Sequence, residues 1–155
     1  MSDAVVRDAA AKDLPQMMAF GDVMAELPRW SEAAWQALLT GVGAVRRIVL
    51  VAAEGERVLG FAVFALVAKF AELESIAVAA GSRGQGIGDA LLSAGILRCI
   101  AWGAESLELE VRDSNARARR FYAAHEFVEQ GRRSAYYSEP TEDAVLYALP
   151  LTRVP

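Results

Sequence analysis

The stretch from Gly88 to Gly103 constrains the fold of this 155-residue chain more than any other part of it. Asp89 and Arg98 are its only charged residues, so the helix that its spacing predicts is apolar nearly all round. A helix of that kind is normally buried, because water would otherwise meet apolar side chains on every face. We therefore expect it to pack against a sheet in the middle of the domain.

Three strand-like runs come before this helix, and they predict an antiparallel meander. They are rich in β-branched and aromatic residues, and the first two flank a tight turn at Glu54-Gly55-Glu56. The third run alternates apolar and polar residues and ends at Gly81. The three ranges are 46–55, 57–67 and 71–80.

The other expected elements lie on either side of the meander and the apolar helix. On the N-terminal side we expect a strand at 4–9, a helix from about Asp13 to Glu26 with Pro15 in its first turn and Pro28 after it, and a short helix that starts at the N-cap Ser31 and is ended by Gly41 and Gly43. On the C-terminal side we expect a strand at 106–112, a helix from about Asn115 to Glu126, and an antiparallel pair of strands at 127–133 and 144–149.

This order, β-α-α-β-β-β-α-β-α-β-β, predicts an α/β fold built on one mixed sheet. A domain of roughly 150 residues buries about two thirds of the surface of its unfolded chain, so the length suits one hydrophobic core. We therefore expect a single domain over residues 1–155.

The composition excludes several classes of function. The chain has 16 basic and 20 acidic residues, and its net charge of −4 favours a cationic substrate over nucleic acid or an anionic membrane. One cysteine, Cys99, and one histidine, His125, are too few for a disulfide framework or a zinc site. The N-terminus has no basic start followed by an apolar stretch. We expect a metal-free cytoplasmic protein that is a monomer or a weak dimer.

The segment AAGSRGQGIGDALL, at 79–92, predicts an anion-binding turn between the third strand and the apolar helix. Glycines at such a junction expose backbone N–H groups at the positive end of the helix dipole, where phosphate binds well. A P-loop is a poor fit, because it needs Lys and then Ser or Thr after its last glycine, and Gly86 is followed by Ile87, Gly88 and Asp89.

A dinucleotide-binding fingerprint fits the same turn poorly. It needs a glycine where Asp89 stands, and it belongs after the first strand of a βαβ unit rather than after a meander. Glu108 could imitate the ribose-binding acid of that motif, but the expected strand continues through Glu108 instead of ending there. The pattern that remains is Arg83-x-x-Gly86-x-Gly88.

Arg83-Gly84-Gln85-Gly86-Ile87-Gly88, after Ile76-Ala77-Val78, resembles the acetyl-CoA pyrophosphate loop of the GNAT superfamily of N-acetyltransferases. The predicted element order is similar to that fold over nearly the whole chain. In that family the pantetheine arm lies along the strand where it splays from the next one, and a backbone N–H polarises the thioester carbonyl. The resemblance implies that acetyl-CoA is bound by Ile76, Ala77, Val78, Arg83, Gly84, Gln85, Gly86, Ile87, Gly88, Asp89 and Asn115.

Three C-terminal segments resemble, more narrowly, the bacterial ribosomal-protein-alanine N-acetyltransferase (RimI-type) family. They are LELEVRDSNARARRFYAAHEF at 107–127, RRSAYY at 132–137 and EDAVLYAL at 142–149. The resemblance implies acetyl transfer to the alanine N-terminus of a small-subunit ribosomal protein, whose basic tail would suit an acidic enzyme. A GNAT enzyme acting on a small amine or a lysine, and an acyl-CoA-binding sensor without turnover, are the alternatives.

The same resemblance makes Glu110 the general base and Tyr122 the general acid. The residues alone also allow plainer roles. Glu110 shares one strand face with Glu108 and Arg112, and that face would simply meet solvent. Tyr122 lies two helical turns after Asn115, so one helix face would carry an N-cap and a core aromatic side chain.

The resemblance further implies that Arg133, Tyr136 and Tyr137 line the channel for the acceptor peptide, although a surface hairpin would look similar. The arginines at 117, 119 and 120 could reach the 3′-phosphate of coenzyme A, but such a basic run is more often a solvated helix face, and they are interpreted as one.

Three residues depart from the family pattern. Asp89 stands where a basic residue is common, and it would repel pyrophosphate if it pointed inward. His125 occupies a position that is usually Leu, and Glu126 replaces a glycine. The helix end before Glu126 therefore lacks the residue that most easily forms a left-handed cap.

Overall fold

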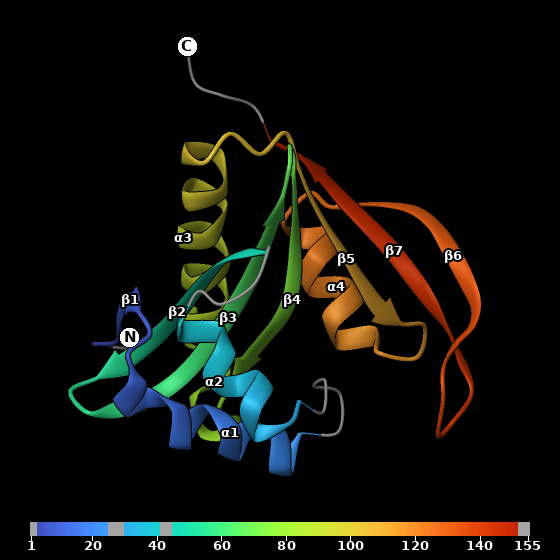
Figure 1. Ribbon diagram of the computed structural model, residues 1–155. Coiled ribbons are helices and arrows are strands. Elements are labelled where there is room, and N and C mark those ends of the chain that lie inside the picture. The colour runs from blue at the N-terminus through green and yellow to red at the C-terminus, as the bar shows by residue number, and fades with distance from the viewer. Residues whose placement is uncertain (1–2, 25–29, 41–44, 152–155) are drawn as a thin grey trace.

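The computed structural model describes residues 3–24, 30–40 and 45–151. Within these ranges the elements follow the predicted order, with short 3₁₀ turns added at Ala11–Asp13 and Ala80–Ser82 (Figure 1). The strands are β1 (Val5–Asp8), β2 (Arg46–Glu54), β3 (Arg57–Val67), β4 (Phe70–Val78), β5 (Ser106–Arg112), β6 (Val128–Tyr137) and β7 (Glu142–Pro150). The helices are α1 (Leu14–Val23), α2 (Glu32–Thr40), α3 (Ile87–Ala101) and α4 (Ala116–Ala124).

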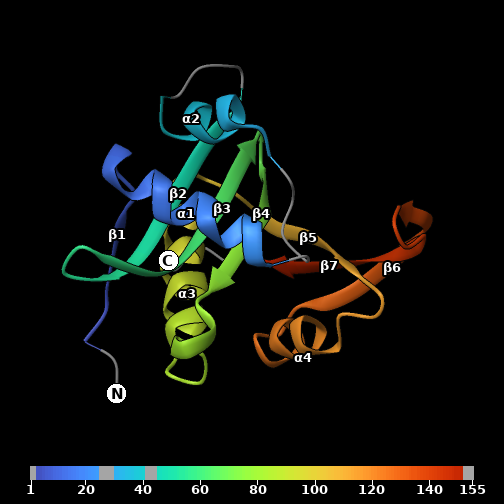
Figure 2. The same ribbon diagram turned by 90° about the horizontal axis from the view of Figure 1, so that it is seen from below.

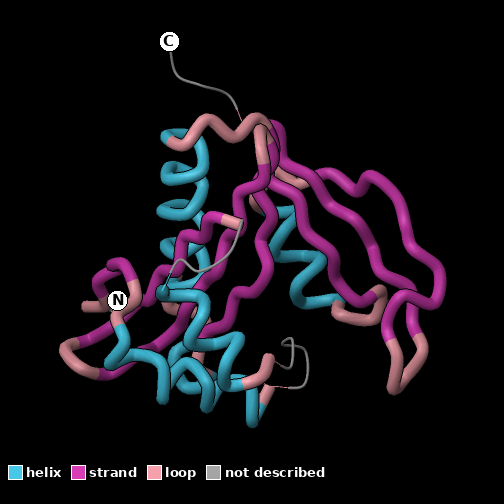
Figure 3. The backbone as a smooth tube through the Cα atoms, viewed as in Figure 1, coloured by secondary structure: helices cyan, strands magenta, loops and turns pink. Residues whose placement is uncertain are grey.

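The seven strands of the described ranges form one mixed sheet, in the order β1-β2-β3-β4-β5-β7-β6 (Figure 3). The predicted meander is confirmed, since β2, β3 and β4 are antiparallel neighbours and Gly55 turns the first hairpin with a φ of 57°. Among the strands that the structure describes, only β4 and β5 are parallel neighbours. The predicted α/β class is therefore confirmed.

Both predicted N-caps are confirmed. The side chain of Ser31 accepts a hydrogen bond from the Ala34 N–H at 3.1 Å, and that of Asn115 accepts one from the Ala118 N–H at 3.2 Å. Each bond satisfies a backbone donor that has no partner within its own helix.

The predicted end of the first helix is wrong by a few residues. α1 ends at Val23 rather than near Glu26, because Met24 has extended backbone and caps the helix by donating its N–H to the Phe20 carbonyl. The proposed stops at Pro28, Gly41 and Gly43 lie outside the described residues.

The helices cover the two faces of the sheet in pairs (Figure 2). On one face, α1 and α2 bury Met17, Phe20 and Trp35 against β2 and β3. On the other face, α3 and α4 bury apolar side chains against β3, β4, β5 and β7 in the larger core cluster. This two-sided burial explains why β3 is apolar along nearly its whole length.

α3 packs on the sheet as predicted, but it is not buried on every side. Leu91, Leu92 and Cys99 face the core, whereas the side chain of Leu97 is 68% exposed. The exposed face carries small or isolated apolar residues, which a protein surface tolerates when they are scattered. The apolar composition alone therefore overestimated the burial of this helix.

The α4 helix ends without glycine. Its C-cap is His125, and Glu126 adopts the left-handed conformation with a φ of 70°. The turn therefore has the ordinary geometry of a left-handed helix end, and a glutamate bears the steric cost that glycine would avoid.

β4 and β5 separate soon after they pair. Their register covers only residues 70–72 and 106–108, and Figure 1 shows the strands diverging beyond that point. A bulge on β4 occurs at Glu74, because Leu73 pairs with Phe64 and Ser75 pairs with Val63. A bulge bends its strand and changes which face the following side chains meet. The parting of the two strands leaves one edge of β4 unpaired with β5 over residues 73–78.

Candidate functional site

A cavity of about 430 Å³ lies in the opening between β4 and β5. Its wall is built from β4, from the turn that leads into α3, from the end of β5 and from α4, together with Met24 and Tyr137. Elements far apart in sequence thus converge where the sheet splits. Pockets formed where a sheet opens in this way commonly bind small molecules.

The turn into α3 is held open by two left-handed glycines. Gly84 has a φ of 79° and Gly86 a φ of 78°, and Gly86 is the N-cap of α3. An L-residue at either place would be strained. The first amides of α3 have no acceptor within the helix, so they can donate to an anion in the cavity. This geometry is what the glycine spacing predicted.

Glu110 reaches the cavity from β5 and is partly shielded by β6. Its side chain is 24% exposed, and its Oε1 lies 3.3 Å from Nε of Arg133. The pKa of Tyr136 is raised, chiefly because its hydroxyl can hydrogen-bond to the Glu110 carboxylate. The strand alternates as predicted, with Leu107, Leu109 and Val111 buried on the opposite face.

Tyr122 meets the same cavity from α4. It is only 7% exposed and packs against Phe127 and Tyr147 in the core. Burial raises the pKa of its hydroxyl well above the usual range, so the group stays protonated. Tyr122 therefore lines the cavity and belongs to the core at once.

Residues 14–127 match the model of the acetyltransferase (GNAT) family. The chain belongs to this family. The predicted membership of the chain in the GNAT superfamily is thereby confirmed.

Curated relatives of this GNAT protein include two bacterial enzymes. The [ribosomal protein bS18]-alanine N-acetyltransferase of Escherichia coli (strain K12) is 38% identical over 98 residues, which are 62% of this chain and 66% of that protein. The enzyme of the same name from Haemophilus influenzae is 37% identical over 98 residues, 61% of this chain and 66% of its own length. The aligned segment thus spans slightly less than two thirds of these relatives.

Solved structures share the fold over almost the whole chain. The ribosomal-protein-S18-alanine N-acetyltransferase of Escherichia coli has a TM-score of 0.84 at 29% identity, and the match covers 98% of this chain and 96% of that one. An Arabidopsis thaliana protein solved in complex with acetyl-CoA also has a TM-score of 0.84, at 16% identity, with 96% and 98% covered. At that low identity the second likeness concerns the fold alone.

Most of the predicted site residues lie on the wall of the cavity in this GNAT fold. They are Ile76, Ala77, Val78, Arg83, Gly84, Gly86, Ile87, Gly88, Asp89, Glu110, Asn115, Tyr122 and Tyr137. Three predicted residues are not part of the wall, namely Gln85, Arg133 and Tyr136. Gln85 is exposed to solvent, and the other two lie above Glu110 on β6.

Several wall residues were not predicted. Glu74, Ser75 and Arg112 come from the diverging parts of β4 and β5, and Arg117 comes from the first turn of α4. The missed signal for Arg117 was its spacing, since it lies about one turn before Phe121, which also lines the cavity. Nothing in the sequence alone indicated the bulge at Glu74.

The acidic pair Glu142 and Asp143 holds the β6–β7 hairpin in place. Glu142 accepts a hydrogen bond from the Ser114 N–H and pairs with Arg112 at 3.5 Å. Asp143 accepts the Ala135 N–H at 2.9 Å. These carboxylates therefore orient the strand that faces Glu110.

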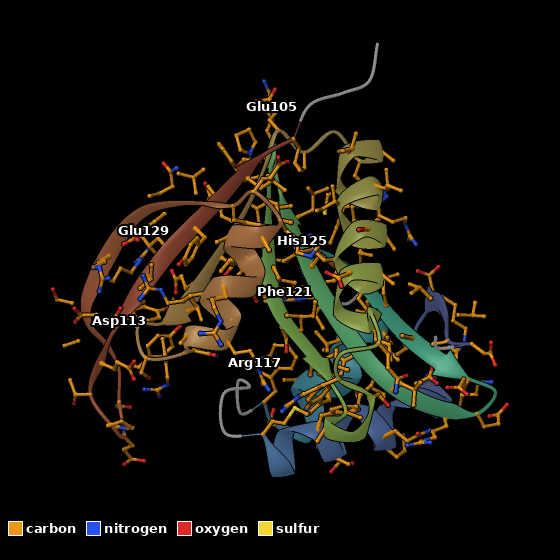
Figure 4. All side chains as sticks on the ribbon, turned by 180° about the vertical axis from the view of Figure 1, so that it is seen from behind. Glu105, Asp113, Arg117, Phe121, His125 and Glu129 are labelled. Carbon is orange, nitrogen blue, oxygen red and sulfur yellow. The ribbon has the colours of Figure 1, made fainter. Side chains whose placement is uncertain are left out.

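Two departures from the family pattern contact each other. His125 Nε2 lies 2.6 Å from Oδ1 of Asp89, so the end of α4 is tied to the first turn of α3. Figure 4 shows His125 and Phe121 on the side of α4 that faces α3, and their rings lie 4.7 Å apart. The Asp89 carboxylate is therefore drawn toward His125, although Asp89 still lines the cavity.

No helix within the described ranges is long and apolar enough to cross a membrane.

Proposed function

We propose that this protein transfers the acetyl group of acetyl-CoA directly to the N-terminal α-amine of another protein. The observation that carries the proposal is a single cavity whose wall includes the glycine-rich turn, Glu110 and Tyr122. Anion binding, proton removal and proton donation are the three tasks that acyl transfer from a thioester to an amine requires.

The cavity suits coenzyme A in both of its chemical parts. The free amides at the start of α3 would hold the pyrophosphate, because they sit at the positive end of the helix dipole. The unpaired edge of β4 over residues 76–78 would hydrogen-bond the two amides of the extended pantetheine arm, in the manner of an added strand. Asn115, at the start of α4, would line the same path.

Glu110 would act as the general base. An N-terminal α-amine has a reference pKa near 8 and is about one tenth neutral at pH 7, whereas a lysine side chain near 10.4 is far less so. The difference of about 2.4 units corresponds to roughly 3.3 kcal/mol of deprotonation. A single carboxylate therefore suffices for an N-terminal amine more readily than for a lysine.

Tyr122 would act as the general acid. As the amine nitrogen bonds to the acetyl carbon, the carbon–sulfur bond breaks and the electron pair stays on sulfur. The amine proton passes to Glu110 and the hydroxyl proton of Tyr122 passes to the sulfur, so charge and protons balance. A hydroxyl that burial keeps protonated is available for this step at any physiological pH.

The preferred acceptor is the alanine N-terminus of a small-subunit ribosomal protein. The names of the two curated relatives support this choice. So does charge, because a basic ribosomal tail complements a chain with a net charge of −4. Arg133, Tyr136 and Tyr137 would border the entrance for the peptide from the β6 side.

The release of coenzyme A thiol tests this function. With acetyl-CoA present, a basic peptide that begins with alanine should be acetylated faster than spermidine, free amino acids or an N-acetylated peptide with one lysine. A preference for spermidine or lysine would reassign the acceptor within the same fold. Calorimetric binding of acetyl-CoA without thiol release on any amine would favour a sensor and contradict the proposal.

A further inference from the structure

The Glu110 carboxylate already has a cation beside it. Arg133 reaches across the face of β7, and its Nε lies 3.3 Å from Oε1 of Glu110. The Arg133 side chain is 58% exposed, whereas that of Glu110 is 24% exposed. The pair thus joins an exposed side chain to a partly enclosed one.

A bulge in β6 directs Arg133 toward Glu110. Arg133 pairs with Ala144 and Tyr137 pairs with Glu142, so three residues of β6 lie opposite Asp143 alone. Ala135, at the centre of the bulge, has a φ of 49°. Such a conformation costs an alanine energy and persists only where the surroundings enforce it. Here Asp143 enforces it by accepting the Ala135 N–H.

An aromatic ring supports the arginine from the same bulge. The guanidinium of Arg133 lies 5.6 Å from the ring centroid of Tyr136, within the range of a cation–π contact. The β6 bulge, the Tyr136 ring and the Glu110 carboxylate therefore hold the Arg133 guanidinium beside Glu110.

An incoming amine must compete for that place. At pH 7 most α-amines are protonated, and an ammonium ion seeks the same carboxylate that Arg133 occupies. Other carboxylates lie near Glu110: burial and then Glu74, Glu110 and Glu108 raise the pKa of Glu72, while Arg47, which pairs with Glu74 at 2.7 Å, lowers it. A guanidinium that gives up Glu110 to the ammonium loses a charge-assisted contact and needs a new acceptor close by.

We propose that Arg133 selects peptide N-termini over simple amines by transferring its guanidinium from Glu110 to the first carbonyl oxygen of the acceptor. This inference rests on the proposed acetyl transfer. In an N-terminal residue the carbonyl oxygen is two bonds from the α-carbon that bears the amine. When the amine displaces the guanidinium, this oxygen therefore arrives beside it. A polyamine or an alkylamine has no carbonyl there, so it offers the Arg133 guanidinium no acceptor in place of the Glu110 carboxylate.

A pair of matched amines tests the role of Arg133. Alaninamide and isopropylamine have the same branched carbon skeleton around the amine, but only alaninamide has the carbonyl. The measured quantity is kcat/KM for alaninamide divided by kcat/KM for isopropylamine. Comparing this ratio between the native protein and Arg133→Ala cancels the different basicities of the two amines.

We expect Arg133→Ala to lower the ratio about tenfold, as for the loss of one hydrogen bond from a charged donor. The matched control is Arg132→Ala, because Arg132 pairs with Asp113 and Glu129 instead of Glu110. The control should keep the native ratio.

Three results would overturn the inference. A ratio in Arg133→Ala within twofold of the native value would show that the carbonyl does not use this arginine, while acetylation itself would still support the proposed function. An equal fall in Arg132→Ala would point to general surface charge. If the native protein acetylated neither amine nor any peptide, the proposed function would fail and this inference with it.

Discussion

The side chain of Glu110 meets a cavity on one side and an arginine of β6 on the other. Its neighbour on the same strand face, Glu108, is exposed and is not part of the cavity wall. The two glutamates therefore form a natural pair for separating a chemical role from a general effect of charge on this face.

Replacing Glu110 by Gln should lower kcat/KM for an alanine-starting peptide about a hundredfold near pH 7, because a positioned base contributes 10²–10⁴-fold. The deficit should shrink toward pH 9, where the α-amine loses its proton without help. Thiol-release kinetics from pH 6 to 9 measure this. Glu108→Gln should stay close to the native protein, and a Glu110→Gln profile parallel to the native one would remove Glu110 from the mechanism.

The burial of the Tyr122 hydroxyl predicts how kcat changes at alkaline pH. Burial raises its pKa, so the protonated form that donates to sulfur persists as the pH rises. We expect kcat to show no loss from this group up to about pH 10, the reference value for tyrosine. Tyr122→Phe should lower kcat about a hundredfold with little change in acetyl-CoA affinity. An alkaline fall in native kcat that disappears in Tyr122→Phe would contradict the expected direction.

At the scale of elements, the close packing of α3 against the sheet depends on one glycine. A Cβ atom added to Gly95 would lie 2.0 Å from the ring of Phe64, which is 1% exposed in the core. The helix can lie this close to β3 only because residue 95 has no side chain. The same helix carries the proposed anion site at its N-terminus, so the packing of α3 against β3 also positions that site.

Gly95→Ala should therefore lower the free energy of unfolding by about 2 kcal/mol, the usual cost of overpacking a core. The change runs against helix propensity, which favours alanine over glycine by about 1 kcal/mol. Urea titration measures the difference. Ser93→Ala, at an exposed position of the same helix, is the control and should change little. A Gly95→Ala protein as stable as the native one would contradict the packing described.

The contact between α3 and α4 yields a prediction for coenzyme binding. Asp89 lies in the first turn of α3, and its side chain is 62% exposed. A charge there repels a bound pyrophosphate by roughly 1 kcal/mol or less at solvent-exposed separations. Asp89→Asn should thus bind acetyl-CoA about threefold more tightly by calorimetry in low salt, with less gain in high salt. Glu105→Gln removes the same charge far from the cavity and should leave affinity unchanged, and weaker binding by Asp89→Asn would refute the repulsion.

For the whole molecule, local sequence patterns predicted the order of the elements well. The meander, both N-caps and the glycine-rich turn depend on residues close in sequence, such as Gly55, Ser31 and Gly86. Their physical causes are turn geometry and capping, which a short window of sequence contains.

The unpredicted features depend on contacts between distant residues. The bulge at Glu74 is defined only by the pairing of β4 with β3. The contact of Asp89 with His125 joins two residues that are 36 positions apart in the sequence. The position of Arg133 over Glu110 similarly depends on a β6 bulge held by Asp143. Local patterns thus reveal which residues are candidates, while tertiary pairing decides which of them meet.

The central claim is that one cavity brings an anion-binding turn, a base and an acid to the same thioester. A crystal structure with acetyl-CoA bound tests it most directly. We predict the pyrophosphate within hydrogen-bonding distance of the amides at 84–89, and the thioester between Glu110 and Tyr122. Acetyl-CoA bound elsewhere, or a thioester directed away from these two side chains, would contradict the account.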